Sequence, residues 1–128
     1  STSNDSKSAD VTIGPAGDVT MHVGDLDQAG SDQGRTWTAS VTIKVESGGH
    51  VPVSGATVSG AFSAGAKGTA SCITSASGTC FVTKARLRGT GVTFSVTGAT
   101  HATRTYQGGN NHDPDGDSNG TTIVVPHP

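Results

Sequence analysis

The sequence predicts an all-β protein, a two-sheet sandwich of about eight strands with no helix of note. Two observations carry this prediction. Apolar and polar side chains alternate in several short segments, which is the period of a strand with one buried face. Only 31% of the 128 residues are hydrophobic, and Gly, Ser and Thr dominate the remainder, which disfavours helices. A chain of this length forms one domain.

The strands are expected within residues 18–128, which we take as the domain, after a polar linker or partly ordered N-terminal extension over 1–17. The clearest segment is RTWTASVTIKVES, in which the alternate positions Trp37, Ala39, Val41, Ile43 and Val45 are apolar. The other expected strands, in order, are DVTMHV, ATVSGAF, TASCIT, GTCFVT, GVTFSVT, TRTYQ and TTIVV. A barrel is the alternative, but inward positions that mix small and large residues favour two facing sheets.

The two cysteines, Cys72 and Cys80, flank the turn-like run ITSASGT. Facing positions of a hairpin are close enough for a disulfide, so we expect one disulfide within a single β-hairpin. Closing so short a loop would stabilise the fold by roughly 2–3 kcal/mol on the chain-entropy estimate. A disulfide forms in an oxidising compartment, so the sequence predicts a secreted, extracellular protein.

Charge and motif content argue against several functions. The net charge is −2 without a basic patch, so nucleic acid and anionic membrane are poor partners. No G-x-S-x-G motif occurs, and bridged cysteines leave no thiol nucleophile, so we expect no enzymatic activity. A stacking site for sugars is poorly supported, because Trp37, Phe62 and Phe94 alternate inward and we expect Tyr106 and Phe81 to pack as well.

Aspartates cluster in two stretches, VGDLD and DPDGDSNG. Calcium takes 6–8 oxygen ligands, and alternating Asp residues in a loop can aim several carboxylates at one point. If the end of the first strand meets the start of the last, the two stretches converge, and a cation would relieve their mutual repulsion. The predicted calcium ligands are Asp25, Asp27, Asp113, Asp115, Asp117 and Asn119. The alternative is that both stretches only form turns.

The five histidines give no comparable signal. They lack H-x-x-x-H spacing and a cysteine partner, so zinc is not expected. His112 adjoins the second aspartate stretch, but calcium prefers oxygen ligands. His22 alternates onto the polar face of its strand, where we expect it on the surface.

The run PVSGATVSG, the segment GTASCITSASGTCFVT and the terminal Asp motif together resemble bacterial immunoglobulin-like (Big-type) domains. The span 18–125 is similar to C-terminal accessory domains of secreted subtilisin-like proteases and other secreted hydrolases. The resemblance implies an immunoglobulin-like Greek-key β-sandwich that is a non-catalytic appendage, and it makes the upstream catalytic domain of the same chain the expected partner.

Taken together, the residues and the resemblance predict a monomeric, calcium-binding accessory domain of a secreted bacterial hydrolase, and a protease is the hydrolase we expect. Such a domain would stabilise its parent or help it attach to a protein substrate, a polysaccharide or a surface. The alternative is a carbohydrate- or cell-surface-binding module of the adhesin type.

Overall fold

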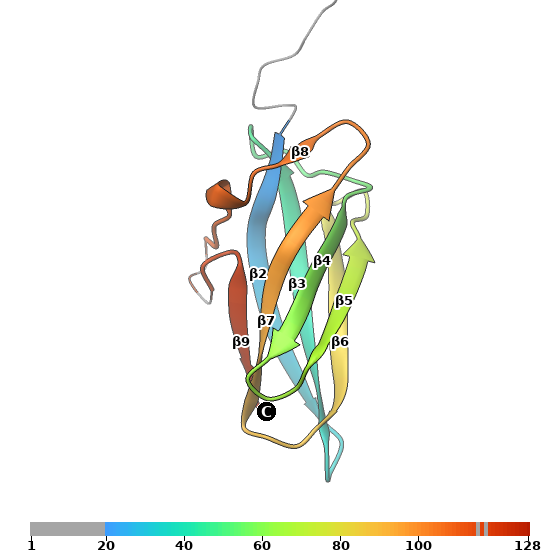
Figure 1. Ribbon diagram of the computed structural model, residues 1–128, viewed down its shortest axis with the longest axis vertical. Helices are drawn as coiled ribbons and strands as arrows, with labels where there is room; N and C mark the ends of the chain where they lie inside the picture. Colours follow the sequence, from blue (N-terminus) through green and yellow to red (C-terminus); the bar gives the residue numbers. More distant parts are fainter. Residues whose placement is uncertain (1–19, 115, 117) are drawn as a thin grey trace, which may run out of the picture.

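The computed structural model describes residues 20–114, 116 and 118–128, and in this part the chain is an all-β sandwich, as predicted. The strands are β2 (Thr20–Asp32), β3 (Trp37–Ser47), β4 (Thr57–Ser63), β5 (Gly68–Ile73), β6 (Thr79–Leu87), β7 (Gly91–Thr100), β8 (Thr105–Tyr106) and β9 (Thr122–Pro126). Two four-stranded sheets, in the orders β6-β3-β2-β8 and β5-β4-β7-β9, pack against each other (Figure 1).

Helical structure in the described residues is limited to one short 3₁₀ turn, η2 (Gly108–Asn110). No helix among these residues is long and apolar enough to cross a membrane. The predicted linker over 1–17 lies outside the described residues.

The core lies between the two sheets and is built by the alternation seen in the sequence. Along β3 the inward residues Trp37, Ala39, Val41, Ile43 and Val45 are fully buried. From the facing sheet, the rings of Phe62 and Phe94 lie 5.1 Å apart, between centroids, in the same core. The expectation that the tryptophan and these two phenylalanines point inward is confirmed.

Strand β2 is longer than predicted. The sequence places Asp25 and Asp27 in a loop after the first strand, but both lie within β2, which continues to Asp32. The pairing with β3 is irregular between Val23 and Asp25, so Gly24 is an extra residue in the ladder. Such a β-bulge reverses the parity of the side chains that follow it. After Leu26 no residue of β2 is buried, so no apolar alternation marks the second half of the strand in the sequence.

The bulge determines what the outer face of β2 carries. His22 pairs with Glu46 before the bulge, and Asp25 and Asp27 pair with positions on β3 after it. Met21, Val23 and Leu26 point into the core. Because side chains alternate along a strand, His22, Asp25 and Asp27 share the face away from the core.

The disulfide forms as predicted, between Cys72 and Cys80, but not within a hairpin. Cys72 lies on β5 and Cys80 on β6, which belong to different sheets. The segment between them therefore crosses from one sheet to the other instead of reversing within one, and the bond joins the two layers at their edge. The hairpin prediction was wrong because eight-residue spacing fits both connections equally well.

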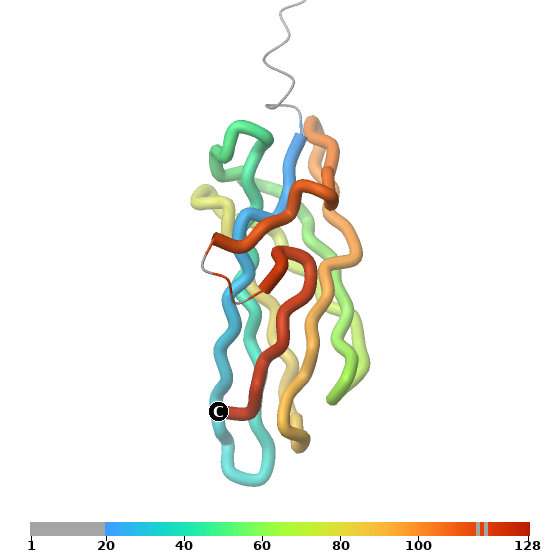
Figure 2. Tube along the Cα trace, turned by 90° about the vertical axis from the view of Figure 1, so that its left-hand side faces the viewer, coloured from blue at the N-terminus to red at the C-terminus, as the bar shows by residue number. Residues whose placement is uncertain are grey.

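The calcium hypothesis placed the first and last strands side by side, and β2 and β9 are indeed in contact, although they belong to different sheets. Strand β2 pairs in parallel with β8, and β9 belongs to the opposite sheet. The two aspartate stretches are brought together by the segment joining β8 to β9, which crosses the outer side of β2 (Figure 2).

Candidate metal centres

The segment 107–121, which we call the crossing segment, is fixed to β2 by hydrogen bonds at the bulge. The backbone N–H of Val23 donates to Asn111 Oδ1 at 2.8 Å, and the N–H of His112 donates to the Val23 carbonyl at 3.0 Å. The amide nitrogen of Asn111 donates to the Tyr106 hydroxyl at 2.6 Å and to Thr121 Oγ1 at 3.0 Å. Asn111 thus takes the place of a neighbouring strand on the edge of β2 where the short pairing with β8 has ended.

Hydrogen bonds also join the described residues of the crossing segment to one another. The hydroxyl of Ser118 donates to the Asp113 carboxylate and accepts from the N–H of Gly120 at 3.0 Å. Gly120 has a φ of +85°, and a Cβ there would overlap the backbone of His112. Only glycine fits such a position without strain, so this backbone conformation requires glycine at position 120.

Three of the predicted calcium ligands come together on the outer face of β2. The pKa of Asp25 is raised to about 7. Burial is the largest cause, followed by a hydrogen bond with the Asp113 carboxyl and by the negative charges of Asp27 and Asp113. The Oδ1 atom of Asp25 is buried and finds no hydrogen-bond partner among the described residues. Strand and crossing segment therefore share a cluster of carboxyl groups, which we call the aspartate cluster.

The other predicted calcium ligands are placed differently. Asp115 and Asp117 lie outside the described residues. The side-chain oxygen of Asn119 accepts hydrogen bonds from the N–H groups of Thr121 and Thr122 at 2.9 and 2.7 Å. This is an Asx turn that leads into β9, so the structure gives Asn119 a turn-forming role.

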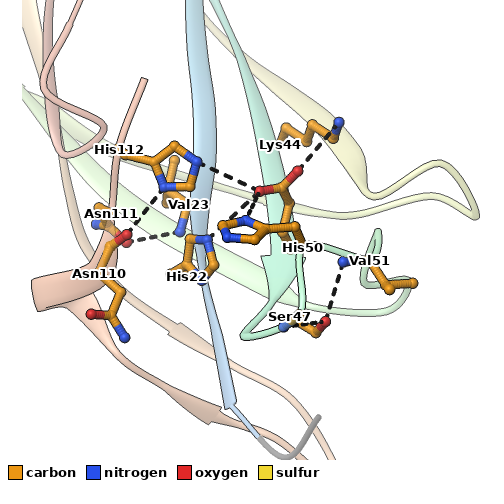
Figure 3. A network of polar contacts seen from close by, with 11 residues as sticks. His22, Val23, Lys44, Ser47, His50, Val51, Asn110, Asn111 and His112 are labelled. Carbon is orange, nitrogen blue, oxygen red and sulfur yellow. Dashed lines mark hydrogen bonds and ion pairs between the residues drawn. The ribbon is translucent and has the colours of Figure 1, made fainter. Parts of the chain in front are cut away.

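A second group of side chains lies next to the aspartate cluster, and it combines three imidazoles with one carboxylate. Its members, the histidine–glutamate cluster, are His22, Glu46, His50 and His112. One donor atom from each lies within 4.8 Å of all the others. Figure 3 shows the three imidazole rings converging from separate segments, with ring centroids 5.0–5.4 Å apart.

Glu46 is the centre of the histidine–glutamate cluster. Its Oε1 atom lies 3.2 Å from His50 Nδ1, 3.6 Å from His22 Nε2 and 3.7 Å from His112 Nε2. The other oxygen, Oε2, lies 3.5 Å from the ammonium nitrogen of Lys44. The Glu46 carboxylate is thus surrounded by three imidazole nitrogens and one ammonium nitrogen.

Local structure explains how the four side chains meet. His22 and Glu46 are cross-strand partners on β2 and β3. His50 follows in the turn after β3, where its N–H donates to the Ser47 carbonyl at 2.8 Å. A Cβ on Gly24 would overlap the Glu46 carboxylate, so the bulge glycine leaves the space that this side chain occupies.

Burial and charge set the protonation of this cluster. Burial, then the charges of His112 and His50, lower the pKa of His22 and outweigh the Glu46 carboxylate, which opposes the shift. Burial raises the pKa of Glu46, but its hydrogen bond with His50 and the nearby Lys44 outweigh this and hold the pKa below its usual value. Near neutral pH the site therefore combines an uncharged imidazole with an ionised carboxylate, and both are forms that bind metal ions.

The sequence did not predict this cluster. His22 was expected on the surface, but only 3% of it is exposed, because the crossing segment covers the outer face of β2. The four residues come from three separate stretches of chain, and no local spacing rule detects such a set. The pair Glu46 and His50, four residues apart, is the only local signal.

One exposed apolar region lies away from both clusters. Phe81 was expected to pack, but 65% of it is exposed, as is 66% of Ile73. The two residues line a groove of about 430 Å³ beside the Cys72–Cys80 disulfide. Phe81 is on the outer face of β6, where no described segment covers it.

No protein-family model, curated protein or solved structure matches this chain in the three comparisons made.

Proposed function

We propose that the chain is a non-catalytic, calcium-binding immunoglobulin-like accessory domain of a secreted bacterial hydrolase, of the protease type. The observation that carries this proposal is the gathering of Asp25, Asp27 and Asp113 where the crossing segment lies over β2. Oxygen ligands from a strand and from a distant loop are what a hard divalent cation needs in order to fasten the two together.

Calcium would act on stability. Without a cation, burial and repulsion raise the pKa of Asp25, which means that the folded state disfavours its charged form. A bound cation reverses this preference and joins the crossing segment to β2. Binding to the native state alone would add roughly 2.7 kcal/mol at a hundredfold excess of free calcium over Kd.

Other features support a secreted, non-catalytic role. The chain's two cysteines are joined in a disulfide, which is stable in an oxidising compartment and leaves no thiol nucleophile. The expected partner is a catalytic domain of the same chain, and a resistant appendage would protect that enzyme from unfolding and proteolysis.

Calcium titration with a matched pair of variants tests the proposal. Thermal unfolding is followed with calcium and with chelator for the unmodified chain, for Asp25→Asn and for Asp32→Asn. Asp32 is the exposed last residue of β2. Its Oδ1 accepts a hydrogen bond from the Gly34 N–H at 2.9 Å, which an asparagine side chain can also accept. We expect calcium to raise the melting temperature of the unmodified chain and of Asp32→Asn, and to have little effect on Asp25→Asn. Equal shifts in all three proteins, or none, would contradict the proposal.

The groove beside the disulfide favours a second candidate function, a carbohydrate- or cell-surface-binding module. Exposed aromatic rings such as Phe81 stack on sugars, and an apolar surface is normally buried in a complex. Retention on insoluble polysaccharide or on cell walls, lost in Phe81→Ala and kept in Phe62→Leu, would select this function over the stabilising one. Phe62 is a suitable control because it is buried.

A further inference from the structure

We propose that His22, Glu46, His50 and His112 form a binding site for one divalent transition-metal ion of the zinc type. The proposal does not depend on the proposed function, because it uses none of the aspartates. It rests on the geometry of the donors, on the direction of the His112 hydrogen bond and on a buried nitrogen that has no hydrogen-bond partner in the described part of the chain.

The donor spacing fits tetrahedral coordination. Zinc bonds to histidine nitrogen and carboxylate oxygen are about 2.0–2.1 Å long, and the edges of a tetrahedron are about 1.6 times that length, so ligand atoms should lie about 3.3–3.4 Å apart. The distances from Glu46 Oε1 to the three nitrogens are 3.2, 3.6 and 3.7 Å. The three oxygen-to-nitrogen distances therefore lie within a few tenths of an ångström of this spacing, and all four donor atoms lie within 4.8 Å of one another.

Hydrogen bonding orients His112 for coordination. Its Nδ1 lies 3.2 Å from the Asn110 carbonyl oxygen, which can only accept, so Nδ1 carries the proton of the neutral ring. Nε2 then presents a lone pair toward Glu46 Oε1, also an acceptor, 3.7 Å away. Two acceptors that face each other need a cation, a proton or a bridging water between them. A ring N–H held by a backbone carbonyl is also the usual support of a metal-bound histidine.

His22 supplies the independent observation. Its side chain is 4% exposed, and its Nε2 atom finds no hydrogen-bond partner among the described residues. The 3.6 Å to Glu46 Oε1 is too long for a hydrogen bond. A buried polar atom without a partner costs about 1–3 kcal/mol, and a bond to a metal ion at the centre of the cluster would remove that cost.

The ligand set selects the class of metal. Imidazole nitrogen is preferred by zinc, copper, nickel and iron, whereas calcium and magnesium prefer oxygen. The site is also accessible, because the side chains of His50 and His112 are 62% and 40% exposed. A bound ion would join β2, the end of β3 with its following turn, and the crossing segment.

Zinc titration of the full chain, held in excess calcium and followed by calorimetry, tests the site. The variants are His50→Gln and His112→Gln, which change accessible side chains, and His127→Gln is the matched control, an exposed histidine at the other end of the molecule. We expect one zinc ion per chain, with affinity lowered roughly tenfold or more in each of the first two variants and unchanged in the control. Cobalt in place of zinc should give the strong visible absorption of a tetrahedral site.

Asp25→Asn separates this proposal from the calcium site, because it should lose the calcium effect and keep zinc binding. Absence of zinc binding, a loss in only one of the two cluster variants, or an equal loss in His127→Gln would overturn the proposal.

Discussion

Replacement of Asn111 by alanine tests how the crossing segment is held on β2. The substitution removes three hydrogen bonds, of 2.8, 2.6 and 3.0 Å, to Val23, Tyr106 and Thr121. At about 1 kcal/mol for each bond, and with the Val23 N–H left without its partner, we expect the free energy of unfolding to fall by about 3 kcal/mol. Such a loss is a large share of the stability of a domain of this size.

Urea unfolding measures this loss, with Asn110→Ala as the control. Asn110 is its exposed neighbour in the same segment, and Figure 3 shows its side-chain amide pointing away from the cluster. We expect a lower midpoint at constant slope for Asn111→Ala and a change below about 0.5 kcal/mol for Asn110→Ala. Asn111→Ala with the stability of the unmodified chain would refute the idea that this side chain replaces a missing strand.

Three further predictions follow from the same structure. Reduction of the single disulfide should lower the unfolding free energy by roughly 2–3 kcal/mol, measured by urea unfolding with and without reductant; an unchanged midpoint would contradict this. Gly24→Ala should displace the Glu46 carboxylate and weaken zinc binding in calorimetry, whereas Gly98→Ala, where a Cβ meets open space, should not. In chelator, the Asp25 pKa is raised from 3.8 to about 7, so its stabilising effect is complete below pH 4 and is lost as pH rises through 7. Solvent screening leaves a loss of about 1–2 kcal/mol, and the decline should be absent in Asp25→Asn when unfolding is measured across this range.

The strands and the core could be predicted from the sequence because they depend on a local period. The inward row that begins at Trp37 reads directly as alternation, and each predicted segment overlaps a strand. The second half of β2 could not be predicted, because Gly24 reverses the alternation and no residue after Leu26 is buried, so no apolar row continues. The cysteine pair was predicted correctly, but its position between the sheets depends on the path of the chain in space.

The candidate sites were only partly predictable for the same physical reason. Asp25 and Asp27 repeat at a short spacing, so they stand out in the sequence, and the structure brings them to Asp113. The histidine–glutamate cluster depends on the crossing segment, which places His112 over His22 although 90 positions separate them in the chain. Contacts at that separation are set by the whole topology and leave no local pattern.

A crystal structure of the chain grown with zinc and calcium, with anomalous diffraction at the zinc edge, tests the central claim most directly. The structure predicts one zinc peak bonded at about 2.0–2.2 Å to nitrogens of His22, His50 and His112 and to an oxygen of Glu46. A map in which the four side chains keep their positions around water, with no anomalous peak, would contradict it.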